Sequence, residues 1–260
     1  MTNQIIFFGN GPLADTALSV LERHFDVVFH ARTKEDLEKV KEIKRSNPEI
    51  HGILASFGVL IKKDLLELFE PEGIINIHPS LLPKFRGASP IESAILAGDT
   101  DFSVSIMKLA TGMDAGPIFY QTTISGLPLE KSAIYTALAE TGANWLVKNL
   151  TNLPTPTPQN HENATFCGKF DKRSSLLDPE NKPAEQLLRE IIAFSGYPKS
   201  KYALFGHECI ILAAHIANPS ETPLIGIKCQ DGQILALDRI QPAGRKPMDA
   251  KSFLNGYAKN

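Results

Sequence analysis

The sequence predicts an α/β fold, a Rossmann-like and mostly parallel sheet with helices on both faces, followed by a small C-terminal β-barrel of the OB-like kind. Apolar runs alternate with helical segments over the first 150 residues, which favours a parallel sheet. Short strands separated by turn residues dominate the last hundred, and such strands close economically into a barrel. We therefore expect a first domain at 1–151, a proline-rich linker at 152–160 and a second domain at 161–260.

The first domain opens with a buried strand, Gln4–Phe8, and a helix at 12–23 with proline at its first position. Two segments, 33–36 and 89–92, resemble capping boxes that start further helices. The remaining expected strands are 26–30, 51–55, 73–78, 101–109 and 117–124, and the remaining expected helices are 33–45, 62–69, 89–97 and 129–150. Ligands of such sheets bind beyond the carboxyl ends of the strands.

The second part of the chain follows a stretch with three alternating prolines, residues 152–158. Prolines in this pattern favour an extended, semi-rigid spacer. Beyond it we predict one helix, 183–194, and strands at 207–213, 224–229 and 233–240.

Composition describes an ordinary soluble protein of 260 residues, 43% hydrophobic and 22% charged. Without a long apolar run or a basic and apolar leader, we expect a cytoplasmic protein. Cys167, Cys209 and Cys229 lack the spacing of a disulfide framework or a zinc site. The net charge is −2, but residues 160–260 hold 13 Lys and Arg against 11 Asp and Glu, a mild excess that permits an RNA partner.

A catalytic set is predicted near the middle of the chain. Asn76-Ile-His-Pro-Ser-Leu-Leu-Pro83 ends an apolar strand, and Asp114 follows within Thr111-Gly-Met-Asp-Ala-Gly116. Asn76 and His78 alternate along the strand, so their side chains face the same side. An amide and an imidazole can stabilise an oxyanion, and a carboxylate can orient the imidazole and manage an amine's proton. The combination suits acyl transfer to an amine.

Taken singly, each of these residues has a structural interpretation. A lone histidine is more often structural than catalytic. Residues 80–83 alone would be a strand-ending turn, and Asp114 between two glycines would be a turn aspartate. Catalysis is favoured because the amide and the imidazole share a face beside a proline-stiffened turn.

Residues 76–83 and 111–116 together resemble the motifs of the 10-formyltetrahydrofolate-dependent formyltransferases. Within that superfamily, Lys84-Phe-Arg-Gly-Ala-Ser-Pro-Ile91 is similar to the continuation seen in the methionyl-tRNA formyltransferases, and residues 237–255 resemble their closing segment. Ala193-Phe-Ser-Gly-Tyr-Pro198 fits an aromatic and proline stretch of their second domain. The resemblance spans nearly the whole chain.

The resemblance implies transfer of a formyl group from 10-formyltetrahydrofolate to the α-amino group of methionine on initiator methionyl-tRNA. Asn76 and His78 would stabilise the oxyanion, and Asp114 would hold His78 charged and help to remove the amine's proton. The folate site would be lined by Ser80, Leu81, Leu82 and Pro83. The second domain would contact the tRNA through residues such as Lys169, Arg245 and Lys246. We expect a monomer that uses no metal and binds no membrane.

One departure leaves more than one function open. Members acting on tRNA carry a basic, glycine-rich loop after the second strand, whereas residues 30–34 lead almost directly into the next helix. Selection among tRNAs is therefore in question. A formyltransferase for a small amine, such as an amino sugar nucleotide, would share the catalytic set. No feature of the sequence favours a formyltetrahydrofolate hydrolase, and the intact Asn76, His78 and Asp114 argue against an inactive tRNA-binding or folate-binding homologue.

Overall fold

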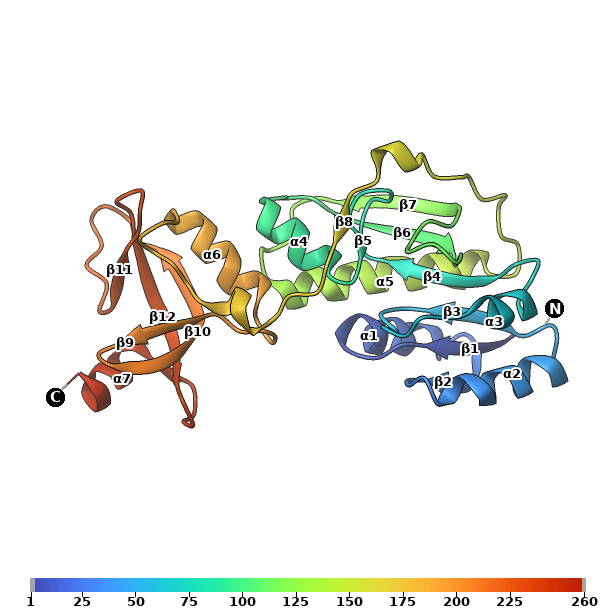
Figure 1. Ribbon diagram of the computed structural model, residues 1–260, viewed down its shortest axis with the longest axis horizontal. Coiled ribbons are helices and arrows are strands. Elements are labelled where there is room, and N and C mark those ends of the chain that lie inside the picture. Colours follow the sequence, from blue (N-terminus) through green and yellow to red (C-terminus); the bar gives the residue numbers. More distant parts are fainter. Residues whose placement is uncertain (1–2, 259–260) are drawn as a thin grey trace. The chain divides into compact units, whose positions relative to one another are not determined.

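The computed structural model describes residues 3–258 and divides them into two compact units (Figure 1). The first unit comprises the chain up to Ile91 together with Thr100–Gly168. The second comprises Glu92–Asp99 and the chain from Lys169 onward. The domain limits expected at residues 151 and 161 stay a prediction.

A six-stranded sheet forms the centre of the first unit, in the order β2-β1-β3-β4-β6-β7. β1 to β4 are parallel, whereas β6 and β7 are added antiparallel. The strands are β1 (Gln4–Phe8), β2 (Asp26–Ala31), β3 (His51–Leu54), β4 (Ile74–His78), β6 (Phe102–Lys108) and β7 (Ile118–Ile124). The six predicted strands are all present, and the predicted α/β, mostly parallel sheet is confirmed.

The helices connect the strands as the sequence predicts. They are α1 (Pro12–Leu21), α2 (Asp36–Ser46), α3 (Lys63–Leu68), α4 (Pro90–Ala97) and α5 (Lys131–Asn149). α2 begins three residues later than expected, and its cap residue Glu35 makes no side-chain capping bond. Only one half of the predicted capping box is present, in which the Asp36 carboxylate accepts from the backbone N–H of Thr33 at 2.8 Å. The connection from β2 to α2 is correspondingly short.

Alternation along β4 decides which side chains face the site. Helix α5 packs so closely on this strand that a Cβ at Gly142 would lie 2.6 Å from Cγ2 of Ile77. Ile77 therefore faces α5. Because neighbouring residues of a strand point to opposite faces, Asn76 and His78 point away from that helix. His78 is the last residue of β4 and Asn76 lies two residues before it, near the carboxyl edge at which such sheets bind ligands.

The segment after α5 runs along the first unit. Thr157 and Ile118 exchange two backbone hydrogen bonds of 2.8 Å. Further on, the short strand β8 (Phe166–Cys167) pairs in parallel with β5 (Arg86–Gly87), which begins three residues after the end of the 76–83 motif. A short 3-10 helix, η1 (His161–Asn163), lies between Thr157 and β8 along the chain. This route carries residues 157–167 to the neighbourhood of His78.

The second unit is a curled antiparallel sheet in the order β11-β12-β10-β9, with β13 added to β12. Its elements are η2 (Lys172–Ser175), α6 (Ala184–Ala193), β9 (Lys201–Leu204), β10 (His207–Ile216), β11 (Gly226–Lys228), β12 (Ile234–Pro242), β13 (Met248–Asp249) and α7 (Ala250–Tyr257). Its core includes Leu187, Ile211, Leu237 and Phe253, all buried. The predicted C-terminal β-domain is confirmed, although β9, β13 and α7 were not predicted. Within residues 3–258, no helix is both long and apolar enough to cross a bilayer.

Candidate active site

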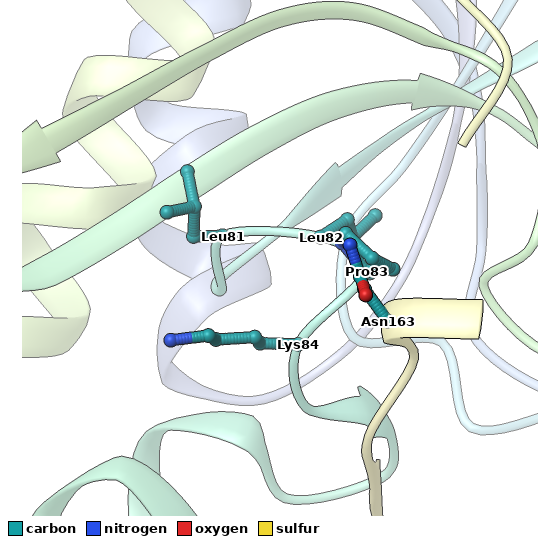
Figure 2. Close-up of a pocket in the computed structure, with 5 residues that line it drawn as sticks. All are labelled: Leu81, Leu82, Pro83, Lys84 and Asn163. Carbon is teal, nitrogen blue, oxygen red and sulfur yellow. The ribbon is translucent and has the colours of Figure 1, made fainter. Parts of the chain in front are cut away.

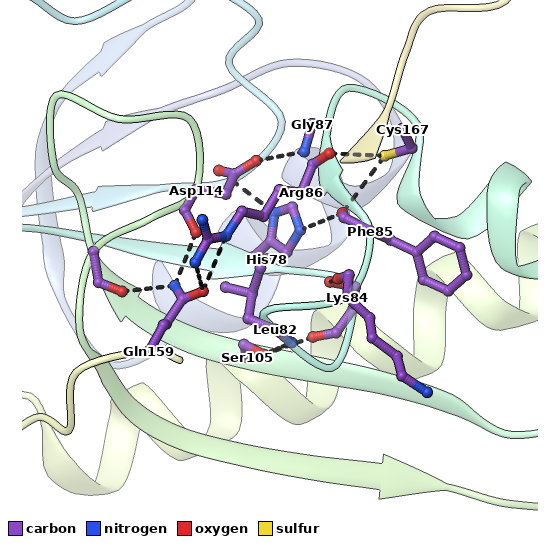
Figure 3. A network of polar contacts seen from close by, with 12 residues as sticks. His78, Leu82, Lys84, Phe85, Arg86, Gly87, Ser105, Asp114, Gln159 and Cys167 are labelled. Carbon is purple, nitrogen blue, oxygen red and sulfur yellow. Dashed lines mark hydrogen bonds and ion pairs between the residues drawn. The ribbon is translucent and has the colours of Figure 1, made fainter. Parts of the chain in front are cut away.

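His78 and Asp114 meet at the carboxyl end of β4. The imidazole Nδ1 lies 3.7 Å from Oδ1 of Asp114, and the two side chains are 5% and 16% exposed (Figure 3). Asp114 comes from the loop between β6 and β7, so the two residues are brought together by the antiparallel strands at this side of the sheet. The structure thus places the predicted imidazole and carboxylate side by side.

The other ring nitrogen of His78 is engaged. Nε2 lies 3.1 Å from the carbonyl oxygen of Phe85, which only accepts hydrogen bonds, so Nε2 carries the proton. Nδ1 is then unprotonated in the neutral ring and faces Asp114. Burial lowers the pKa of His78, and the charge of Arg86 acts in the same direction, while Asp114 and the Phe85 carbonyl oppose them. Burial thus favours the neutral ring, and a proton that binds Nδ1 would lie beside the carboxylate of Asp114.

The backbone around Asp114 is held in an unusual conformation. Asp114 has φ of +46°, in the left-handed region that aspartate tolerates better than most residues. Its Oδ2 accepts a 2.8 Å hydrogen bond from the backbone N–H of Gly87. Gly87 has φ of +124°, and a Cβ there would lie 2.0 Å from the carbonyl oxygen of Cys167. The donor to Asp114 consequently requires glycine at position 87.

Asn76 is the third predicted catalytic residue, and it is 5% exposed. Its side chain makes no hydrogen bond to another residue between 3 and 258, although buried amides are normally paired. It shares a face of β4 with His78. The side chain of Asn76 is nearly but not fully enclosed, and with no partner among the described residues its amide is available to a bound molecule.

The turn after β4 is fastened to β6 and β7 by two polar side chains. The hydroxyl of Ser105, which is fully buried, donates to the carbonyl of Ser80 at 2.6 Å and accepts from the N–H of Leu82 at 3.1 Å. Gln121 donates to the Leu82 carbonyl and to Ser105 Oγ, both at 2.8 Å. Within the turn, Ser80 Oγ donates to the Lys84 carbonyl at 2.7 Å. Sequence reasoning missed Ser105 and Gln121, although a serine within the apolar strand β6 is a signal for a buried polar role.

A pocket of about 370 Å³ opens on this turn (Figure 2). It is lined by Leu81, Leu82, Pro83, Lys84 and Asn163. Three of the four predicted folate-binding residues therefore line a cavity, while Ser80 is buried and its hydroxyl closes the turn. Figure 2 shows the Leu81 and Lys84 side chains extending from the turn on one side and Asn163 on the other. Their binding of folate stays a prediction.

Two further polar residues behind Asp114 were also missed. Arg86 and Gln159 are buried and hydrogen-bonded to each other, and Gln159 reaches the backbone of the Asp114 loop (Figure 3). Because 73 residues separate them, no local pattern links them in the sequence. Across the described part of the chain, no group of three or more His, Cys, Asp and Glu side chains is placed to hold a metal ion.

Comparison with known proteins places the chain in a family. A family model for formyl transferases matches residues 12–150, and one for the formyl transferase C-terminal domain matches residues 169–258. The chain belongs to the formyl transferase family. The resemblance carried by the 76–83 and 111–116 motifs is thereby confirmed. This formyl transferase is 35% identical to a methionyl-tRNA formyltransferase of Dechloromonas aromatica (strain RCB) over 243 residues, which cover 88% of the chain and 77% of that protein.

Solved structures share the fold of this formyl transferase. Methionyl-tRNA formyltransferase from Clostridium thermocellum matches with a TM-score of 0.69 at 21% identity, over 93% of this chain and 99% of that one. HypX from Aquifex aeolicus in complex with tetrahydrofolic acid matches with a TM-score of 0.73 at 17% identity, over 99% of this chain and 47% of that one. Both likenesses cover the two units of the chain, and both are likenesses of fold.

Proposed function

We propose that this formyl transferase moves the formyl group of 10-formyltetrahydrofolate to the α-amino group of methionine on initiator methionyl-tRNA. The observation that carries the proposal is the unpaired Asn76 amide beside the His78–Asp114 pair, because together they supply an oxyanion donor and a proton acceptor at one point. The match to the methionyl-tRNA formyltransferase of Dechloromonas aromatica over most of both chains supports the choice of substrate.

The amine nitrogen attacks the formyl carbon, and the formyl oxygen becomes an oxyanion in the tetrahedral intermediate. The Asn76 amide donates a hydrogen bond to that oxygen, and the Nδ1–H of charged His78 joins it. Collapse then breaks the bond between the formyl carbon and N10 of the folate. The amine loses one proton and N10 gains one. Asp114, beside Nδ1, takes part in passing that proton.

Asp114 opposes the effect of burial on His78 but does not outweigh it, because the pKa of His78 is lowered on balance. Burial favours the neutral ring, whereas the adjacent carboxylate favours the charged ring. An oxyanion forming at the same place would add to the second effect. Charge on the imidazole is thus favoured most when the intermediate is present, which is the condition for stabilising a transition state rather than a substrate.

The folate donor would lie against the turn that follows β4. The pocket there is lined by Leu81, Leu82 and Pro83, which offer apolar surface to a ring system. Ser105 and Gln121 fix the turn from behind, so its backbone is preorganised. In the proposed reaction, side chains and the folate co-substrate carry the chemistry.

The tRNA would be held in part by the second unit. Lys169, Arg245 and Lys246 are exposed there, and none of them is paired with a carboxylate of the described chain. In the first unit only residues 32–35 connect β2 to α2, so no long basic loop lies at that point. Phosphate contacts by basic side chains alone give affinity without sequence selection.

Formyl transfer measured with three acceptors tests the proposal: initiator methionyl-tRNA, elongator methionyl-tRNA and an amino sugar nucleotide, each with 10-formyltetrahydrofolate. We expect transfer to initiator methionyl-tRNA. Transfer to the sugar nucleotide alone would move the function to a small-amine formyltransferase. Release of formate without an acceptor would indicate a hydrolase, and no turnover of the donor at all would indicate an inactive homologue.

A further inference from the structure

Arg86 is a buried cation of the first unit, and it lies next to the catalytic pair (Figure 3). The residue is 4% exposed, yet its guanidinium forms no ion pair with a carboxylate among residues 3–258. Nε and Nη2 donate to Oε1 of Gln159 at 3.1 and 2.6 Å, and Nη2 lies 3.0 Å from Nδ1 of His161. Arginine stays charged in proteins, and burying an unpaired charge is costly. A residue that served only to fill space here would be apolar.

Gln159 connects Arg86 to the loop that carries Asp114. Its Nε2 donates to the backbone carbonyl of Asp114 at 2.8 Å and to that of Gly116 at 2.7 Å. Both hydrogen atoms of the amide are thereby used on the loop, while the amide oxygen is used on Arg86. One side chain therefore spans the turn that holds Asp114 in its left-handed conformation.

We infer that Arg86 and Gln159 are positioning residues for the reaction: Gln159 fixes the Asp114 turn, and Arg86 fixes Gln159 and places a positive charge beside the catalytic pair. Neither residue touches the reacting atoms in this role. The inference rests on the proposed function, because it concerns how Asp114 is presented to His78.

Asp114 is held from two sides, by Gln159 and by the residue next to Arg86. Gln159 holds the main chain of residue 114, and Gly87, the neighbour of Arg86 in β5, holds its carboxylate. The charged and titratable groups that act on His78 are Asp114 and Arg86, with His161 on the far side of the guanidinium. After burial itself, the Arg86 charge is the other influence that lowers the pKa of His78.

Two substitutions of Gln159 test whether its hydrogen bonds to the turn matter for the reaction, with and without an acceptor kept for Arg86. Gln159→Glu keeps an acceptor for Arg86 and adds a countercharge, but it cannot donate to the carbonyls of Asp114 and Gly116. Gln159→Leu loses both contacts. We expect both variants to lower kcat about tenfold to a hundredfold, with KM for each substrate within about threefold, because small misplacements of a catalytic group carry losses of this size.

The charge of Arg86 is tested by an NMR titration of His78, which needs no substrate. Arg86→Met should raise the pKa of His78, because a nearby positive charge no longer opposes protonation, and Arg86→Lys should return it toward the wild-type value. Lys44→Met is the matched control. Lys44 is a second buried cation of the first unit, bound to the carbonyls of Pro48 and Ile50, and its loss should leave the His78 titration and kcat unchanged.

The outcomes distinguish this inference from the proposed function. No formyl transfer by the wild-type protein would refute the proposed function, whereas the titration would still report on Arg86. Wild-type kcat in a folded Gln159→Glu variant would overturn the positioning role, because its only lost contacts are those to the turn. An unmoved His78 titration in Arg86→Met, or an equal shift in Lys44→Met, would overturn the role of the charge.

Discussion

Nδ1 of His78 and Oδ1 of Asp114 are 3.7 Å apart, a distance that allows an ion pair but is longer than a hydrogen bond. Nε2 of the same ring is already bound to the Phe85 carbonyl, so Nδ1 is the ring nitrogen left for chemistry. The carboxylate favours a proton on Nδ1 but does not hold it in a short hydrogen bond. That N–H can therefore donate a hydrogen bond to the oxyanion of a bound substrate.

The charge of Asp114 is expected to matter more than its shape. Asp114→Asn keeps an oxygen for the Gly87 N–H but removes the charge beside His78, and we expect turnover to fall at least about 100-fold, as it should in His78→Ala. Steady-state formyl transfer measures the loss. Asp64 is a surface carboxylate on α3, and Asp64→Asn serves as the control, with turnover expected within about twofold of the wild-type value. Near-normal turnover in folded Asp114→Asn would remove it from the catalytic set.

Asn76 should show activity and stability moving in opposite directions. Asn76→Leu replaces a nearly buried amide, which has no hydrogen-bond partner among residues 3–258, with an apolar side chain, so the free energy of unfolding should stay equal or rise. The oxyanion donor is lost at the same time, and turnover should fall about 10²- to 10³-fold. Denaturant unfolding and formyl transfer are measured on the same preparation. A variant that is both destabilised and active would assign Asn76 to the core.

Ser105 should support binding of the formyl donor through the turn after β4. Ser105→Ala leaves the Leu82 N–H, the Ser80 carbonyl and the Gln121 amide without their shared partner, at a cost of about 2 to 3 kcal/mol in unfolding free energy. We also expect a raised KM for 10-formyltetrahydrofolate. Ser103→Ala is the control on the same strand.

Among residues 3–258 the Ser103 hydroxyl is hydrogen-bonded to Thr123 alone, so its loss should change stability by less than about 0.5 kcal/mol and leave that KM unaltered. Equal KM values in the two serine variants would contradict the supporting role of Ser105.

His215 should make the stability of the second unit depend on pH. Hydrogen bonds to Asp238 and Glu221, at 2.9 and 2.8 Å, raise the pKa of His215 above its ordinary value. A raised folded-state pKa stabilises below the unfolded value of about 6.5, and the stabilisation is lost as pH rises through the folded value. The side chain is 44% exposed, so solvent screening limits the effect to well under about 1 kcal/mol.

His215→Gln should therefore lower Tm slightly at pH 6 and leave it unchanged at pH 9. Thermal unfolding at the two pH values checks this, with wild-type protein alongside. A larger loss at pH 9 than at pH 6 would reverse the sign and refute the assignment.

The sequence by itself determined the parts that depend on local patterns. Alternating apolar strands and helices predicted the mostly parallel sheet, and residue alternation along β4 placed Asn76 and His78 on one face. The family also followed from contiguous motifs. The short strands β5, β8, β9 and β13 escaped prediction because two to four residues carry no detectable period.

Only the tertiary structure decided how the catalytic groups are held. The hydrogen bonds that hold them join residues 23 to 73 positions apart: Gly87 with Asp114, Ser105 with Leu82, and Arg86 with Gln159. Sequence reasoning sees each as a polar residue that is either exposed or structural. Burial makes the difference, because a polar group removed from water must find a partner, and the fold alone determines which partner is within reach.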